Sequence, residues 1–317
     1  MKKMIALLMG LTLLSVSPAT AETEVDSSLV FLQKAENYLN AAVKESLYRE
    51  AIRYRPDCAE CYFRLGKLFL SQEKYEEAMS EFYFAAEFDP YLEGLHYYLG
   101  STYEMQNNFQ GAMGEYYLVI EHSEDPKIKA SAHLSIGSIY DAVALPESSL
   151  VHFKKATEYD KSNAIAHFNL GIAYDDLQNH HQAILCYQRA YALDSTDIDA
   201  LVNLGVDYCQ LERYDDARDI FLIGLDKDPD NFKLTYNLAN TYLLMEDYEN
   251  ARDKFIRAIE MNPGKSEAYY QLARIYDELG DYENAESAYG KFLDIAPPYY
   301  EIAVEEAKRR VETLQKR

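Results

Sequence analysis

Amide side chains recur at a constant interval of 34 residues in the second half of the chain. They are Asn169, Asn203, Asn237 and Gln271. An amide offers one acceptor and two donors for hydrogen bonds. It can therefore pair with both the C=O and the N–H of an extended polypeptide, whatever the side chains of that polypeptide. The alternative is that these amides only satisfy neighbouring helix ends or water. Solvation would accept Asp, Glu, Lys or Ser equally, so three consecutive Asn favour binding.

The residue before each amide is aromatic or apolar. Aromatic side chains precede Asn169, Asn237 and Gln271, and Val202 precedes Asn203. A polar row beside an apolar row would supply both hydrogen bonds and contact area to a bound chain. The candidate peptide-binding residues are therefore Asn169, Asn203, Asn237, Gln271, Phe168, Tyr236 and Tyr270.

Two cysteines form the motif "CAEC" at Cys58 and Cys61. A redox role would need a strand–helix context, which the helical pattern lacks. Haem attachment would need His where Tyr62 stands, and zinc would need two further ligands. The remaining expectation is a local disulfide, or else two thiols, at the junction of two units. An oxidising compartment favours the disulfide, whose tiny loop would stabilise the fold little. The sequence leaves open whether Cys186 and Cys209 meet.

Motifs for catalysis are missing from the sequence. It contains no Ser/His/Asp signature and no HExxH, and Gly264-Lys265-Ser266 lacks the preceding P-loop glycine. His180 and His181 fall in an expected turn and are weak metal candidates. We therefore expect no enzymatic activity, no metal and no cofactor.

A repeat of about 34 residues organises the chain. A small residue marks each unit at positions 66, 100, 137, 171, 205, 239 and 273. Tyr or Phe follows three positions later, Ala or Ser twelve positions later, and Tyr or Phe again sixteen positions later. Each unit thus has two apolar stretches at helical spacing, separated by a polar turn. Small residues let the two helices approach closely, and aromatic residues fill the space between them.

This pattern resembles the tetratricopeptide repeat family, whose signature has Leu-Gly, Tyr, Ala, Phe and Pro at these offsets. Seven units match, from about Ala59 to Tyr299, although the family's Trp is replaced by residues such as Tyr62 and His133. The resemblance implies an all-α fold: a right-handed α-solenoid, or superhelix, of about seven to eight helix-turn-helix repeats with a C-terminal capping helix. Neither helix of a unit can bury its apolar stripe alone, so neighbouring units must stack.

The repeat also sets the expected domain boundaries. We expect a signal peptide over 1–21, a degenerate N-terminal repeat or cap over 22–58, repeats over 59–92, 93–126, 130–163, 164–197, 198–231, 232–265 and 266–299, and a capping helix over 300–317. The unit at 130–163 departs most from the pattern. Ser149 replaces its Ala, Pro146 falls in its expected turn, and three extra residues precede it.

In the resembled family the first helices of successive units line a concave groove, into which the position before the conserved Leu points. The resemblance therefore places the amides in a groove. A similar asparagine ladder holds substrate polypeptide in superhelical repeat arrays attached to glycosyltransferases. The family's cationic clamp for a C-terminal carboxylate is incomplete here, because the unit after Lys233 and Asn237 has Glu267 and Gln271. Binding of a chaperone tail is not expected.

The first 21 residues have the pattern of a cleaved signal peptide. Lys2 and Lys3 precede an apolar stretch of 13 residues, Met4 to Val16, which is too short to span a membrane. Ala19-Thr20-Ala21 is a small-x-small cleavage site. We expect cleavage after Ala21, a periplasmic or secreted location and no membrane insertion of the mature chain; the alternative is an uncleaved anchor.

The chain is strongly acidic, with 31 basic and 53 acidic residues and a net charge of −22. Such a chain repels phosphate backbones and anionic headgroups, so the expected partner is a protein and not nucleic acid. The leading interpretation is a non-catalytic scaffold that binds an extended polypeptide during envelope assembly or secretion. The alternative is a passive spacer in a larger envelope complex, which would use its convex face or its ends.

Overall fold

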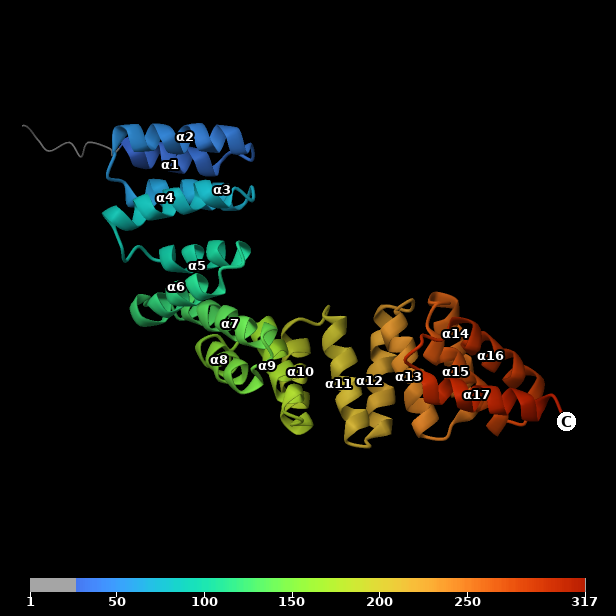
Figure 1. Ribbon diagram of the computed structural model, residues 1–317. Coiled ribbons are helices and arrows are strands. Elements are labelled where there is room, and N and C mark those ends of the chain that lie inside the picture. Colours follow the sequence, from blue (N-terminus) through green and yellow to red (C-terminus); the bar gives the residue numbers. More distant parts are fainter. Residues whose placement is uncertain (1–26, 317) are drawn as a thin grey trace, which may run out of the picture. The chain divides into compact units, whose positions relative to one another are not determined.

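The computed structural model describes residues 27–316, and the expected signal peptide at 1–21 lies outside the described residues. Across 27–316 the regular elements are seventeen α-helices, with no strand. The all-α fold of paired helices is thereby confirmed. The chain divides into two compact units, one ending at Asn108 and one beginning at Phe109. This division falls inside the repeat expected at 93–126. Figure 1 labels the helices in chain order.

In the first unit the described helices are α1 (Ser27–Glu36), α2 (Ala41–Tyr54), α3 (Ala59–Leu70), α4 (Tyr75–Phe88) and α5 (Leu95–Met105). In the second unit they are α6 (Phe109–His122), α7 (Pro126–Ala142), α8 (Pro146–Tyr159), α9 (Ala164–Asp176), α10 (His180–Leu193), α11 (Ile198–Gln210), α12 (Tyr214–Lys227), α13 (Phe232–Leu244), α14 (Tyr248–Met261), α15 (Ser266–Glu278), α16 (Tyr282–Ile295) and α17 (Glu301–Leu314). Within the second unit each helix packs on the next, and the first helices of neighbouring repeats also touch, as α7 with α9 and α11 with α13.

A small residue on the first helix and an aromatic residue on the second set the distance within each pair. A Cβ atom added to Gly66 would lie 2.6 Å from the Phe82 ring, and one added to Gly137 would lie 2.6 Å from the Phe153 ring. Both rings are at most 1% exposed. The aromatic side chain therefore occupies the space that glycine leaves, which is the close approach that the repeat pattern predicts.

The turn between the two helices of a repeat contains one residue in the left-handed backbone conformation. The φ angle is positive at Glu73, Asn107, Ala144, Gln178, Glu212, Glu246 and Gly280. Each of these residues lies seven positions after the small residue that marks its repeat. Only the last of these is glycine, the residue that adopts this conformation without steric cost. The turn geometry is thus imposed by the packing of the pair rather than by the local sequence.

Side-chain caps fix where the first helices begin. Asn163 precedes α9, Asp197 precedes α11 and Asn231 precedes α13, and each side chain accepts a hydrogen bond from a backbone N–H in the first turn. Such a cap satisfies a donor that has no partner within the helix. Because these caps recur every 34 residues, the three helices start in register.

Two local details differ from the sequence-based expectations. Pro146 does not lie in the turn but is the first residue of α8, where its missing N–H costs nothing. His180 and His181 also do not lie in a turn, because α10 begins at His180. The extra residues before the repeat at 130–163 lengthen α7, which starts at Pro126 behind the Asp125 cap and runs for 17 residues.

The last helix, α17, covers the end of the second unit. Its buried residues, Ala307 and Leu314, pack against α16, and Ala303 and Val311 lie partly buried beside them. The opposite side carries charged residues, as a cap on a repeat array requires. None of the described helices is both long and apolar enough to cross a membrane.

Candidate functional site

The predicted amide row lies on the first helices of four consecutive repeats in the second unit. Asn169 is on α9, Asn203 on α11, Asn237 on α13 and Gln271 on α15, and all four side chains are partly exposed. Within residues 27–316, the side chains of Asn169 and Asn237 make no hydrogen bond. Both amides therefore keep their donors and acceptors available to a ligand.

Asn203 differs from its two counterparts. Burial raises the pKa of the Tyr187 hydroxyl, and a side-chain hydrogen bond from Asn203 acts in the opposite direction. The same hydroxyl donates a hydrogen bond to Asp175 Oδ2 at 2.7 Å. Asn203 is thus partly committed to the packing between α10 and α11, a role that neither interpretation of the amides from the sequence included.

The predicted aromatic row serves packing within each repeat. The Phe168 ring lies 5.6 Å from the Tyr187 ring, and the Tyr236 ring lies 5.8 Å from the Phe255 ring. Both contacts join position i of a first helix to position i+19 of the second. Both side chains are only partly exposed, so each contributes one edge, rather than a whole ring, to the surface.

The capping helix α17 contacts the last aromatic residue of the predicted site, Tyr270. The Tyr270 hydroxyl donates to Glu306 Oε2 at 2.7 Å, and its ring lies 5.0 Å from that of Phe292. Gln271 Oε1 accepts a hydrogen bond from Arg274 at 3.1 Å. Asn169, Asn203 and Asn237 thus occupy equivalent positions on three consecutive first helices, whereas Tyr270 and Gln271 lie in the last repeat, beside the capping helix.

Exposed apolar side chains, which the sequence analysis did not select, share the helix face of the amides. Ile165 is 63% exposed, Val206 is 36% exposed and Leu244 is 52% exposed. They lie four residues before Asn169, three after Asn203 and seven after Asn237. Spacings of three, four and seven residues place side chains on one face of a helix. Helical spacing combined with the amide row would have identified them from the sequence.

One ion pair links two of these helices. Lys233 Nζ on α13 lies 2.8 Å from Asp199 Oδ1 on α11, and both side chains are more than half exposed. The two residues are exactly one repeat apart and lie one turn before Asn237 and Asn203. This exposed pair can open at little cost, so it offers one charge of each sign to a ligand.

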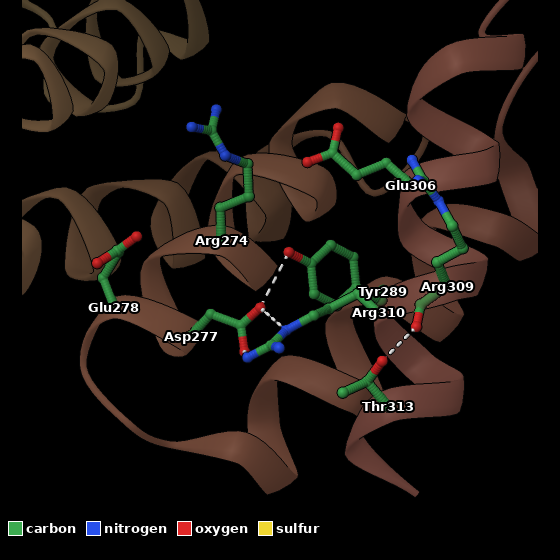
Figure 2. A pocket seen from close by; sticks show the side chains of 8 residues that line it. All are labelled: Arg274, Asp277, Glu278, Tyr289, Glu306, Arg309, Arg310 and Thr313. Carbon is green, nitrogen blue, oxygen red and sulfur yellow. Dashed lines mark hydrogen bonds and ion pairs between the residues drawn. The ribbon is translucent and has the colours of Figure 1, made fainter.

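A polar hollow of about 570 Å³ lies at the C-terminal end, between α15, α16 and α17 (Figure 2). Asp277 stands at its centre and accepts hydrogen bonds from Tyr289 and from Arg310. Arg274, Glu278 and Glu306 line its rim. Because Asp277 is paired with residues of both α16 and α17, these contacts join the capping helix to the last repeat.

The structure joins Cys58 and Cys61 in a disulfide at the start of α3, with their Cα atoms 5.3 Å apart. Cys58 is the residue before the helix, and its sulfur accepts a hydrogen bond from the Cys61 N–H. Cys186 and Cys209 are free thiols, and the Cys209 sulfur lies 3.3 Å from the Thr241 hydroxyl. The open question of the second cysteine pair is thus answered: these two are not bonded to each other.

Stacked pairs of helices, with partly exposed polar groups on the first helix of each pair, place the protein in the class of α-helical repeat proteins. Models of the tetratricopeptide repeat match residues 32–93, 164–197, 202–255 and 230–297, which together are more than half of the chain. The chain belongs to the tetratricopeptide repeat family, whose members typically bind protein partners. No curated protein matches the chain.

Several solved structures share the fold. The C-terminal part of a tetratricopeptide repeat protein from Cytophaga hutchinsonii has a TM-score of 0.64 at 18% identity, covering 77% of this chain and 98% of that one. A tetratricopeptide repeat protein from Parabacteroides merdae has a TM-score of 0.52 at 15% identity, covering 81% and 98%. MamA from Desulfovibrio magneticus has a TM-score of 0.51 at 18% identity, covering 53% and 94%. At these identities the similarity concerns the fold alone.

Proposed function

We propose that the protein is a non-catalytic interaction scaffold whose second unit binds an extended polypeptide segment along α9, α11 and α13. One observation carries this proposal. The free amides of Asn169 and Asn237 share their helix faces with exposed Ile165 and Leu244. Hydrogen-bonding groups without partners, beside apolar side chains in contact with water, are the features that a polypeptide backbone and its side chains complement.

The regular spacing of the amides suits an extended ligand. Each Asn can make one or two hydrogen bonds with backbone groups, and each bond contributes roughly 0.5–1.5 kcal/mol net. Two to four such bonds would contribute roughly 1–6 kcal/mol, which corresponds to a change in affinity of about fivefold to ten-thousandfold, given about 1.4 kcal/mol per factor of ten. Backbone pairing is independent of ligand sequence, so the exposed apolar residues would set the preference among ligands.

Site-specific crosslinking in cells tests the proposal. A photoreactive residue is placed at Val206 or Leu244 on the amide face, or at Ile223, which is 45% exposed on α12. We expect crosslinks to a polypeptide segment from the first two positions and not from Ile223. Mass spectrometry of the crosslinked peptide then identifies the bound segment, and a synthetic copy of that segment provides the affinity measurement.

Amide substitutions complete the test. Asn169→Ala with Asn237→Ala should weaken binding of the segment at least tenfold. The melting temperature should stay unchanged, because neither side chain has a hydrogen-bond partner in the described part of the chain. The matched control is Gln110→Ala with Gln182→Ala, which removes two exposed amides from the second helices α6 and α10. Equal binding by both double variants would sink the proposal and favour the passive spacer, which contacts partners through its outer face or ends.

We also propose that the mature chain is exported and acts in the periplasm or outside the cell, in envelope assembly or secretion. The signal-like pattern of residues 1–21 supports this, as does the disulfide at Cys58 and Cys61, since disulfides persist in oxidising compartments. Intact mass of the protein from fractionated cells is the test. A chain that begins at Glu22 in the periplasmic or secreted fraction is expected, and a chain that retains residues 1–21 would contradict cleavage.

A further inference from the structure

Two residues that break the repeat pattern meet in the second unit. His180 stands at a position occupied by Tyr75, Tyr214, Tyr248 and Tyr282 in other repeats. Asp207 stands at a position that is Leu, Thr, Ile or Ala in the six other matching repeats. Nevertheless His180 Nδ1 lies 2.8 Å from Asp207 Oδ1. Neither substitution is needed to build the fold, since the other repeats form the same helix pairs without them.

A second carboxylate completes the cluster. Asp175 Oδ1 lies 3.3 Å from His180 Nδ1, and one ligand atom from each of Asp175, His180 and Asp207 lies within 4.8 Å of the others. The three side chains come from α9, α10 and α11. A structural ion pair needs one acid for each histidine, whereas this cluster has two acids, so one imidazolium cannot balance both carboxylates when they are ionised.

The buried carboxylate of this cluster is incompletely satisfied. Asp207 is only 2% exposed, and its Oδ2 atom has no hydrogen-bond partner within the described residues. A buried acceptor without a partner is costly. The equivalent of Asp175 three repeats later, Asp277, shows the usual solution, because Arg310 neutralises it. No arginine or lysine pairs with Asp175 or Asp207 in the part of the chain that the structure describes.

We propose that Asp175, His180 and Asp207 form a binding site for a divalent transition-metal ion of the Zn²⁺ class. One imidazole and two carboxylates are ligands that Zn²⁺ accepts, whereas Mg²⁺ and Ca²⁺ prefer oxygen ligands alone. A 2+ ion balances the two carboxylates when His180 is neutral. The Tyr187 hydroxyl already holds Asp175 through Oδ2, as outer residues commonly hold metal ligands. Water would fill the remaining position.

The proposed ion would connect three helices. It would join α9 and α10 of the repeat at 164–197 to α11 of the next repeat, beside Asn203, which contacts Tyr187. Asp175 and His180 are 28% and 24% exposed, so the site is open to solvent on one side. This inference departs from the sequence-based expectation of no metal, and it does not depend on peptide binding.

Zinc titration of the chelator-treated full chain tests the site. We expect one Zn²⁺ per chain by calorimetry, and a rise of several degrees in melting temperature that excess chelator reverses. His180→Tyr and Asp207→Thr install residues that other repeats carry and should fold normally, yet each should bind Zn²⁺ at least tenfold more weakly. Asp207→Asn keeps the side-chain volume and serves if the Thr variant is misfolded by circular dichroism.

His181→Ala is the matched control, because His181 is exposed beside His180 but lies outside the cluster. It should bind Zn²⁺ as tightly as the parent protein. Absence of stoichiometric binding by the parent protein would overturn the proposal and leave a carboxyl pair that shares a proton. Equal affinity of His180→Tyr, Asp207→Asn and the parent protein would also overturn it, because the binding would then belong to other histidines.

Discussion

Arg310 of the capping helix and Asp277 of α15 form a bidentate ion pair. Arg310 Nε donates to Asp277 Oδ2 at 2.7 Å, and Nη2 donates to Oδ1 at 2.8 Å. Asp277 also accepts from Tyr289 on α16 at 3.1 Å, and its side chain is only 14% exposed (Figure 2). One carboxylate thus joins the capping helix to both helices of the last repeat.

Removing the guanidinium should leave this largely buried carboxylate without its cation. We expect Arg310→Ala to lower the free energy of unfolding by about 1–3 kcal/mol in urea denaturation. Arg310→Lys should recover only part of this, because Lys cannot pair through two parallel bonds. Lys308→Ala is the control, since the Lys308–Glu305 pair is exposed and should contribute less than about 1 kcal/mol. Equal losses for Arg310→Ala and Lys308→Ala would contradict the anchoring role.

Deletion of the chain from Glu301 onward should expose the apolar end of the last repeat. Phe292, now 1% exposed, lies in the same cluster as Ala307 and Leu314 of α17. We expect aggregation or a broader thermal transition, because the ends of repeat arrays need polar caps. Light scattering and differential scanning calorimetry measure both effects. A truncated chain as soluble and as cooperative as the parent would show that α17 is not a cap.

Introducing glycine at a left-handed turn position should stabilise the protein, and removing glycine from one should destabilise it. Glu212 has a φ of 58°, where a side chain is strained, so Glu212→Gly should stabilise the protein by about 0.5 kcal/mol. Gly280→Ala should destabilise it by about 1 kcal/mol, although open space surrounds Gly280.

Gly114 of α6 provides the matched control for the turn. It also has open space around it but adopts ordinary helical geometry, so Gly114→Ala should stabilise the helix by about 0.5–1 kcal/mol. Chemical denaturation of the three variants gives the signs. Gly→Ala changes of the same sign at 114 and 280 would show that backbone strain in the turn is negligible.

A pair of histidines, of which His133 is buried and His152 is partly buried, should make stability fall in mild acid. His133 Nδ1 lies 3.1 Å from His152 Nδ1, and burial, followed by His152 and Lys155, lowers the pKa of His133 to about 4. The unfolded chain, with an ordinary histidine pKa near 6.5, binds the proton first as the pH falls. Stability is therefore full above about pH 6.5 and declines toward pH 4, by roughly 2–3 kcal/mol for this group.

His133→Tyr isolates this contribution, because Tyr62 and Tyr269 occupy the equivalent position in other repeats. Denaturant melts of the parent and the variant at pH 7 and pH 4.5 provide the comparison. The variant should lose less stability between the two values than the parent. An identical loss would show that other groups cause the acid sensitivity.

The repeat, and hence the fold, can be predicted from the amino-acid pattern alone. The small residue at 66 or 137 and the aromatic residue sixteen positions later indicate one close contact between two helices. The same contact is expected wherever these two residue types recur at this spacing. The Asn or Asp caps fix the helix starts in the same local way. A 34-residue period therefore specified paired helices, their order and the shared placement of Asn169, Asn203 and Asn237 on first helices.

Which of those side chains remain free depends on contacts between helices, which the repeat pattern does not contain. Within residues 27–316, the side chains of Asn169 and Asn237 have no hydrogen-bond partner, whereas Asn203 contacts Tyr187 and Tyr270 donates to Glu306. Each of these contacts depends on residues of another helix. The meeting of His180 with Asp207 was equally hidden, because 27 residues separate them in the chain. The 34-residue period predicts only the features that all repeats share. A site such as the His180–Asp207 contact forms where one repeat differs from the others and packs against its neighbour.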